Sequence, residues 1–429
     1  MRTLLLTAVL FGTSAGFAAD VPLNTWLLNE KTVATKQLML NMSPVGGLSG
    51  AIVASPQTSG PDYFYHWTRD AALAIDATVS LFEESSGSAR TSYHDMIFQY
   101  ADFSRQAQLN ANMGEPKFLV TGQVFSGQWC RPQNDGPALR AMALIRFSND
   151  LLDQGATTDV VPFLYDGQIP TQSVIKSDLE YVAHHWTDTS CDLWEEVYGD
   201  HFFTRIVQRR ALLEGADLAQ RLNDPGAASY YRQQANLIGT SLANFWNGSW
   251  LVPTLNRTGG LTSKVSGIDS AVILGVVHGD YGDGFLPMLD SQVESTFIAY
   301  VSKFQDLYPV NSQTGTAGVA IGRYPEDVYS GSNFSGGNPW VLLTTVYASY
   351  CYKAAIEATA QGMSAEATQY LTQGDTFLSR VQHHANADGT LSEQIDRNTG
   401  YMTSAANLTW NYVEILNAIG LREKALLLF

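Results

Sequence analysis

The sequence is short of positive charge and of cysteine. Its 429 residues include 25 lysines and arginines against 41 aspartates and glutamates, a formal net charge of −16. This balance repels phosphate backbones and anionic lipid, so we expect neither nucleic acid nor a membrane surface as a partner. None of the three cysteines has the spacing of a metal site. Because their number is odd, at least one thiol is unpaired; one disulfide of unspecified pairing and three buried free thiols fit equally well.

Apolar runs long enough to span a membrane are also missing from the sequence. The N-terminus has the order of a secretion signal instead, with a charged start at Met1-Arg2, a short apolar run over Leu4–Phe11 and a small-residue cleavage site at Gly16-Phe17-Ala18. We therefore expect a signal peptide over residues 1–19 and a secreted, extracellular protein; a buried N-terminal helix is the alternative. Several N-glycosylation triplets indicate a glycoprotein, although chance alone also produces some. They begin at Asn41, Asn247, Asn256, Asn333 and Asn407.

Residues 20–429 have the apolar periodicity of about twelve helices and little strand. Apolar residues four apart over 139–151, for example, mark one buried helix face. Short turns alternate with long loops rich in glycine and aromatic residues, and a small hairpin is expected over Asn247–Leu261. Six helical hairpins with their long loops at one end predict a single all-α domain, in which an inner ring of helices lies within an outer ring. A solenoid fits less well, because no repeat signature is seen. The long loops lie near 42–66, 110–134, 187–199, 247–266, 309–338 and 385–404.

The residues suited to chemistry fall in these loops. The stretch Asp192–Gly199 places the adjacent carboxylates Glu195 and Glu196 beside Trp194. Partial desolvation by the indole favours a neutral, proton-donating carboxylic acid. Adjacent residues do not share a helix face, so the second carboxylate of an acid/base pair must come from elsewhere, and Glu393 is the candidate. Aromatic residues beside carboxylates and arginines suit a sugar site, and hydrolysis of a glycosidic bond takes two carboxyl groups.

Each of these residues also has a purely structural interpretation. Glu195 and Glu196 fit a first-turn pair favoured by the helix dipole, and Glu393 fits a solvated loop residue. Arg323 fits an ion pair with Asp327, four residues later. A Gly-Xaa-Ser-Xaa-Gly motif is absent, so a serine hydrolase is not indicated. These residues all lie in the long loops, which are expected at one end of the molecule, and this shared location favours a single site. Arg69 and Asp70 fit a surface ion pair that caps a helix, and Trp129 and Trp340 fit half-buried core or interface residues. The histidines have no spaced partners and are interpreted as structural: His66, His184 and His185.

Seven motifs, in order along the chain, resemble those of the glucoamylases of glycoside hydrolase family 15. The resemblance covers nearly the whole mature chain and implies an (α/α)6 barrel with a funnel-shaped pocket at the loop end. The motifs are Tyr-Xaa-Tyr-Xaa-Trp-Thr-Arg-Asp at 63–70, Gly-Glu-Pro-Lys-Phe at 114–118, Arg-Pro-Gln-Xaa-Asp-Gly-Pro-Ala-Leu-Arg at 131–140, Asp-Leu-Trp-Glu-Glu-Val at 192–197, Gly-Arg-Tyr-Pro-Glu-Asp at 322–327, Gly-Asn-Pro-Trp at 337–340 and Ser-Glu-Gln at 392–394.

The resemblance implies a role for each residue of the site. Glu195 would be the general acid that protonates the glycosidic oxygen. Glu393 would be the general base that activates water, so that the anomeric configuration inverts and activity peaks at acidic pH. No metal or organic cofactor is implied. The other residues would bind substrate: Arg69, Asp70, Arg323 and the backbone of Leu193 the terminal glucose, Trp194 and Glu196 the next sugar, and Tyr63, Trp129, Trp340 and Trp410 the pocket wall.

The sequence departs from the family pattern at Cys130, where glycine is more usual, and at Phe125, which lacks a tyrosine hydroxyl near the acid. These departures bear on the tuning of the acid and not on the reaction class. The resemblance predicts a monomeric exo-acting enzyme that releases β-D-glucose from non-reducing ends of starch, glycogen and maltooligosaccharides, more slowly at α-1,6 links. No starch-binding module is expected. The alternatives are the same barrel acting on isomaltose, dextran or trehalose, a non-catalytic glycan-binding protein, and a phosphorylase.

Overall fold

Two kinds of helix alternate along the chain in a computed structural model that describes residues 21–313, 315–331 and 333–428. One kind is buried on most faces, whereas the other buries a single stripe. The expected signal peptide, residues 1–19, lies outside the described residues. The buried helices are α2 (Thr68–Glu84), α4 (Gly136–Asp153), α7 (Phe202–Arg221), α9 (Ala271–Gly279), α11 (Val341–Ala360) and α13 (Thr409–Leu426). The half-exposed helices are α1 (Leu23–Leu40), α3 (Gly87–Asn110), α6 (Val174–His185), α8 (Pro225–Leu242), α10 (Ser291–Leu307) and α12 (Ser364–His384).

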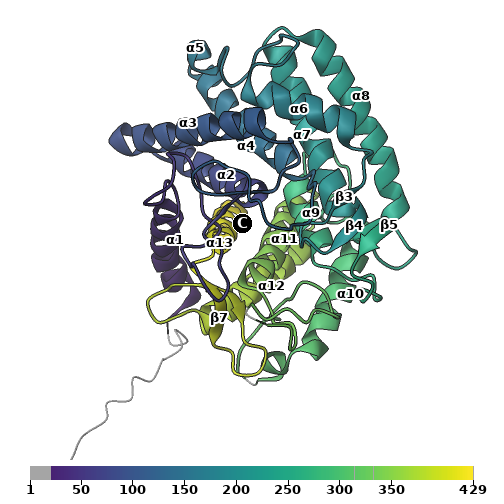
Figure 1. The fold of residues 1–429 in the computed structure, drawn as a ribbon. Coiled ribbons are helices and arrows are strands. Elements are labelled where there is room, and N and C mark those ends of the chain that lie inside the picture. Colours follow the sequence, from purple (N-terminus) through teal and green to yellow (C-terminus); the bar gives the residue numbers. More distant parts are fainter. Residues whose placement is uncertain (1–20, 314, 332, 429) are drawn as a thin grey trace, which may run out of the picture.

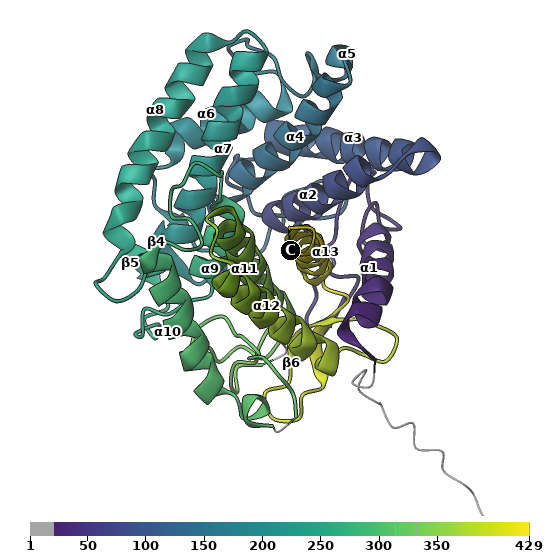
Figure 2. The same cartoon turned by 180° about the vertical axis from the view of Figure 1, so that it is seen from behind.

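The buried helices form a closed inner ring. Consecutive members touch, α2 with α4, α4 with α7, α7 with α9, α9 with α11 and α11 with α13, and α13 closes the ring against α2. The outer helices α3, α6, α8, α10, α12 and α1 pack against α2, α4, α7, α9, α11 and α13 in turn. Figure 1 and Figure 2 show α1, α3, α8 and α10 at the periphery, around α2, α11 and α13. The predicted all-α double ring, an (α/α)6 barrel, is confirmed.

Helix α8 illustrates how local sequence sets the helix boundaries. The side chain of Asp224 accepts a hydrogen bond from the backbone of Ala227, and Pro225 occupies the first turn, where a missing N–H costs nothing. The predicted apolar stripe from Tyr231 to Leu242 is buried. No helix among the described residues is long and apolar enough to cross a membrane. Three short elements lie between the ring helices: α5 (Thr157–Val160) and the 3-10 turns Ala243–Phe245 and Pro309–Ser312.

Short antiparallel strands lie in the long loops. The predicted hairpin over Asn247–Leu261 is wrong in its main pairing, because residues 254–260 pair with 197–201 instead. Residues 385–404, predicted as loop, contain the strand 392–395 and the start of its partner strand, 402–406. Sequence periodicity marks strand residues but not their partners, which the packing of distant loops decides. The pairs are β1 (His66–Trp67) with β2 (Lys117–Phe118), β3 (Ser190–Cys191) with β4 (Val197–His201), β4 with β5 (Thr254–Gly260), and β6 (Ser392–Ile395) with β7 (Met402–Ala406).

Candidate active site

A cavity of about 610 Å³ is lined by residues from all six long connections, a volume within the range of small-molecule sites. In the described ranges, no group of three or more His, Cys, Asp or Glu residues is arranged to hold a metal ion. The connections are residues 41–67, 111–135, 186–201, 243–270, 308–340 and 385–408. Every residue assigned to the site from sequence lines this cavity: Tyr63, Arg69, Asp70, Trp129, Leu193, Trp194, Glu195, Glu196, Arg323, Trp340, Glu393 and Trp410.

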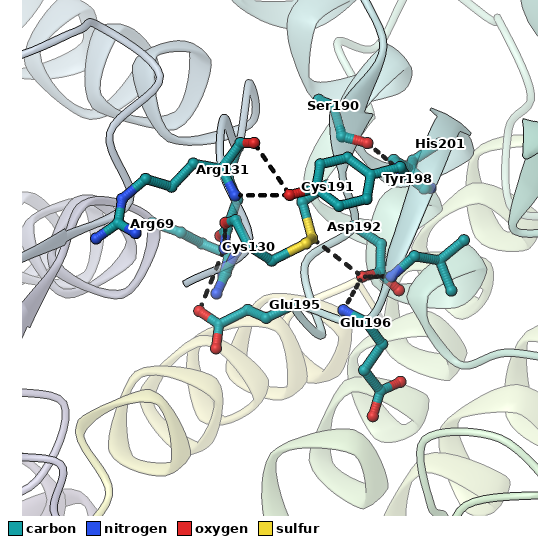
Figure 3. The surroundings of a disulfide bond; sticks show 12 residues. Arg69, Cys130, Arg131, Ser190, Cys191, Asp192, Glu195, Glu196, Tyr198 and His201 are labelled. Carbon is teal, nitrogen blue, oxygen red and sulfur yellow. Dashed lines mark hydrogen bonds between the residues drawn. A yellow bond between two sulfur atoms is a disulfide. The ribbon is translucent and has the colours of Figure 1, made fainter. Parts of the chain in front are cut away.

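Glu195 lies on a tight turn between β3 and β4. Asp192 shapes this turn, because its carboxylate accepts hydrogen bonds from the backbone N–H groups of Glu196 (2.7 Å) and Val197 (3.0 Å). The turn holds Glu195 in the left-handed region, with φ of +68°, a conformation that is costly for a residue with a side chain. Figure 3 shows the side chains of Glu195 and Glu196 leaving the turn in different directions. The two carboxylates therefore do not act as one pair.

Two donors fix the carboxylate of Glu195. Its Oε1 accepts hydrogen bonds from the indole of Trp67 (2.7 Å) and from the amide of Gln133 (3.3 Å). Its Oε2 has no hydrogen-bond partner among the described residues. One oxygen is therefore anchored to the protein while the other remains available at the cavity.

Glu393 lies on β6 and is almost fully buried, with 1% of its surface exposed. Its Oε2 accepts hydrogen bonds from the hydroxyl of Ser404, on the paired strand β7, and from the amide of Gln394 (2.9 Å). The hydroxyl of Tyr63, which is 2.7 Å from that of Tyr329, also faces this carboxylate. Burial raises the pKa of Glu393 to about 7, although the hydrogen bonds and a nearby guanidinium oppose the rise. The solvated-loop interpretation of Glu393 is wrong.

Arg69 and Asp70 lie in the first turn of α2, where their side chains are buried. Arg69 donates hydrogen bonds to Gln133 (2.9 Å) and Asp135 (3.0 Å), and its Nε lies 3.6 Å from Asp70. The guanidinium also lies over the ring of Trp410, 5.6 Å from its centroid. Burial raises the pKa of Asp70 to about 6, against the opposing charge of Arg69. The surface ion-pair interpretation is therefore wrong.

Arg323 both forms the ion pair with Asp327 and lines the cavity, as the sequence suggested. It forms a two-pronged contact with Asp327, four residues later, at 2.8 and 2.6 Å. Its Nη2 is also 3.0 Å from Oε1 of Glu196. The guanidinium is thus held in place by protein carboxylates while it lines the cavity.

Lys264, which the sequence did not indicate, gathers three carboxylates. Its Nζ is 3.0 Å from Glu196, 3.1 Å from Asp192 and 3.2 Å from Asp269. Burial alone would lower the pKa of Lys264, but these carboxylates outweigh burial and raise it. Asp269 in turn accepts a hydrogen bond from the indole of Trp194 (2.8 Å). One ammonium group therefore holds both ends of the turn that carries Glu195.

Two indoles of the cavity wall offer free donors. The indole nitrogens of Trp129 and Trp340 are buried and have no hydrogen-bond partner among the described residues. A buried donor without a partner costs free energy, which a ligand oxygen would recover. Phe125, a departure from the family pattern, packs edge-on against Trp129 with 5.6 Å between ring centroids. It is not among the lining residues, so it acts on the site through the residues that it contacts, Trp129 among them.

The cysteine question that the sequence left open has one answer in the structure. Cys130 and Cys191 form a disulfide, with their Cα atoms 5.8 Å apart (Figure 3). Cys351 is buried and free. Cys130, the second departure from the family pattern, therefore has a partner in the chain and lines the cavity.

Sequence reasoning missed several residues that contact the site. Trp67 and Gln133 stand inside motifs quoted above, which was a usable signal. Ser404 and Lys264 had no signal, because strand pairing and loop packing bring them to the carboxylates. The other lining residues that were not predicted are Ala54, Gln128, Cys130, Tyr198, Gly260, Tyr329, Phe334, Leu342 and Leu408.

A barrel of paired helices that brings two separately anchored carboxyl groups, arginines and tryptophans to one cavity has the construction of a glycoside hydrolase. Comparison with known proteins agrees: the profile of the glycosyl hydrolases of family 15 matches residues 30–420. The chain belongs to this family and is a glycoside hydrolase.

Similar proteins span nearly the whole chain. It is 34% identical to the glucoamylase of Blastobotrys adeninivorans, over 96% of this chain and 74% of that protein. It is also 34% identical to glucoamylase 1 of Rhizopus oryzae, over 92% of this chain and 70% of that protein. The solved structure of the glucoamylase from Saccharomycopsis fibuligera superimposes with a TM-score of 0.86 at 31% identity, covering 98% of this chain and 99% of that one.

Proposed function

We propose that this protein is a glucan 1,4-α-glucosidase that degrades starch, glycogen and maltooligosaccharides. It releases β-D-glucose from non-reducing ends with inversion, and acts more slowly on α-1,6 links. The observation that carries the proposal is the meeting of Glu195 and Glu393 in one cavity, from loops far apart in the sequence. The substrate class is supported by similar proteins that are named glucoamylases.

In the proposed reaction, water attacks C1 of the terminal glucose while the bond from C1 to the glycosidic oxygen breaks. Glu195 gives its proton to that oxygen, and Glu393 takes a proton from the attacking water. Glu195 suits the acid role because its Oε1 is anchored while Oε2 has no partner among the described residues. Glu393 suits the base role because Ser404 and Gln394 fix it through Oε2.

The terminal glucose would be bound by Arg69, Asp70, Arg323 and the backbone of Leu193. These charged groups are buried and already oriented by protein partners, so little freedom is lost on binding. Nε of Arg69 is also buried without a hydrogen-bond partner among the described residues. A sugar hydroxyl would supply the missing acceptor.

The remaining predicted residues suit the wall and the neighbouring sugar position. Trp194 and Glu196 would contact the next sugar, since Lys264 and Arg323 hold the Glu196 carboxylate at the cavity. The wall would be formed by Tyr63, Trp129, Trp340 and Trp410.

The proposal is tested by time-resolved NMR of maltoheptaose hydrolysis. We expect glucose as the first product, with the β-anomer in excess before mutarotation. Glu195→Gln and Glu393→Gln should each lower kcat by about 10²-fold or more, while Glu366→Gln, at an exposed position on α12, keeps wild-type activity. A loss of less than about tenfold in either site variant would remove that residue from its role.

The same assay decides between substrates. Maltose, isomaltose, trehalose and soluble starch are compared, and a preference for isomaltose or trehalose over maltose would replace the α-1,4 assignment. Absence of glucose from every α-glucan would instead favour a binding protein. A strict phosphate requirement would indicate a phosphorylase.

We also propose that the protein is secreted as a monomer, with its catalytic domain beginning near residue 20. The order of charge, apolar run and small residues over residues 1–19 supports secretion. Mass spectrometry of protein recovered from culture medium should find the N-terminus near Ala19 or Asp20, and light scattering should give a monomer mass. Retention of the intact protein in cells would overturn the localisation.

A further inference from the structure

The disulfide joins the two loops that surround the proposed general acid (Figure 3). Cys130 follows Trp129 of the cavity wall, on the connection 111–135. Cys191 directly precedes Asp192, whose carboxylate shapes the turn of Glu195. The cysteines are 61 residues apart, so the bond links different helical hairpins of the barrel.

The loop of Cys130 also supplies a partner of the acid. The amide Nε2 of Gln133 is 3.3 Å from Oε1 of Glu195 and 3.2 Å from the backbone oxygen of Cys130. One half of the disulfide is therefore tied to the turn that carries Glu195, and the other half to the residue that orients its carboxylate. Any shift between the two loops changes the direction of Glu195.

Few other bonds hold these loops in register. Besides the bond from Gln133 to Glu195, the backbone N–H of Cys191 donates to Pro132 (2.8 Å), and the hydroxyl of Tyr198 lies 3.2 Å from the backbone oxygen and 3.3 Å from the backbone nitrogen of Arg131. The contacts of Cys191 and Tyr198 are neutral hydrogen bonds, which exchange readily with water when a loop moves. The left-handed conformation of Glu195 persists only if its surroundings impose it. The covalent link is therefore the strongest constraint between the loop of Gln133 and the turn of Glu195.

We propose that the Cys130–Cys191 disulfide is a positioning element for the general acid. It holds the turn 192–197 against the loop of Gln133, so that Glu195 is aimed at the glycosidic oxygen. The inference rests on the proposed role of Glu195 as acid. Because Cys130 lines the cavity, a small dithiol that enters can attack the bond. Reduction by dithiothreitol gives two protein thiols and cyclic oxidised dithiothreitol, and reoxidation restores the link.

The test compares a substrate that needs the acid with one that does not. Fluoride leaves α-D-glucosyl fluoride with little help from a proton donor, whereas the oligosaccharide that leaves maltoheptaose needs protonation of its glycosidic oxygen. In the variant Cys130→Ser/Cys191→Ser we expect kcat on maltoheptaose to fall by about tenfold or more, because small misplacements of a catalytic group are costly. On the fluoride, kcat should fall by less than about threefold. Cys351→Ser, which removes a thiol outside the disulfide, is the matched control.

Each outcome decides the matter. A parallel fall on both substrates means that the disulfide only maintains the fold, and unchanged maltoheptaose activity means that it positions nothing; both overturn the inference. If the double variant does not fold, native wild-type protein is treated with dithiothreitol, and the same split must appear and reverse on reoxidation. Glu195→Gln is run beside it: if this variant shows no split between the substrates, the proposed acid is wrong, independently of the disulfide.

Discussion

Replacing Ser404 with alanine tests Glu393 as the base without touching its carboxylate. The Ser404 hydroxyl donates to Oε2 of Glu393, and this bond stabilises the ionised form and lowers the pKa. Burial already raises the pKa of Glu393 to about 7, so losing the bond raises it further. The proposed reaction needs Glu393 ionised and Glu195 protonated. One limb of the pH profile of kcat/KM should therefore lie near pH 7 and move to higher pH in Ser404→Ala.

The size of the shift follows from the bond that is lost. A hydrogen bond to a charged group contributes about 1.5 kcal/mol or more, equal to about one pKa unit. At pH 5, below this pKa, the ionised fraction of Glu393 falls by about the same tenfold factor. We therefore expect kcat/KM of Ser404→Ala on maltoheptaose at pH 5 to be about a tenth of the wild-type value, and the two to converge above about pH 8. Initial rates from pH 4 to 9 at constant ionic strength measure both.

A Ser404→Ala profile that superimposes on the wild-type profile, or moves to lower pH, would refute this reasoning. Thr403→Ala is the matched control, because Thr403 directly precedes Ser404 on β7 but does not bond to Glu393. The acidic optimum expected from the family resemblance stays a prediction, and the same wild-type profile tests it.

Three further variants probe stability and binding. Folding raises the pKa of Glu393 from 4.5 to about 7, so the ionised carboxylate lowers the free energy of unfolding progressively between pH 4.5 and pH 7 and has no effect below pH 4.5. Glu393→Gln should therefore gain up to about 3 kcal/mol of unfolding free energy relative to wild type at pH 8 and none at pH 4, measured by urea titration. An equal difference at both pH values would contradict this. Lys264→Met should lose about 3–5 kcal/mol by leaving buried carboxylates unpaired, whereas Lys353→Met, which breaks a partly buried pair with the single carboxylate of Asp280, should lose less. Trp340→Phe keeps the ring but loses the unpartnered N–H, so KM for maltoheptaose should rise about fivefold; an unchanged KM would mean that this N–H does not bind substrate.

The sequence predicts the barrel and the composition of the site, but not what supports it. Alternating loop lengths predict the double ring because short turns force neighbouring helices antiparallel, and this follows from local pattern alone. Glu393 is recognisable by its motif. Ser404 is not, because only the pairing of β6 with β7 brings it to the carboxylate. Lys264 lies in a loop without any pattern, and its role depends on Asp269 of the same loop and on Asp192 and Glu196 of a distant turn. The pairing of the cysteines depends in the same way on how two loops meet.

The two proposed catalytic carboxylates are held by different means, and this difference explains where the site is sensitive. Glu393 lies on a paired strand and is buried, and its Oε2 accepts two hydrogen bonds. The strand pairing and these bonds hold it rigidly. Glu195 stands on a turn in a left-handed conformation, and its partners Trp67 and Gln133 come from two other loops. A substitution next to Glu393 therefore changes its protonation, whereas a shift of the loops changes the direction in which the side chain of Glu195 points. Lys264, which pairs with Asp192 and Glu196, and the disulfide, which ends one residue before Asp192, both constrain this turn. Opening the disulfide should therefore affect protonation of the leaving sugar and spare the attack of water.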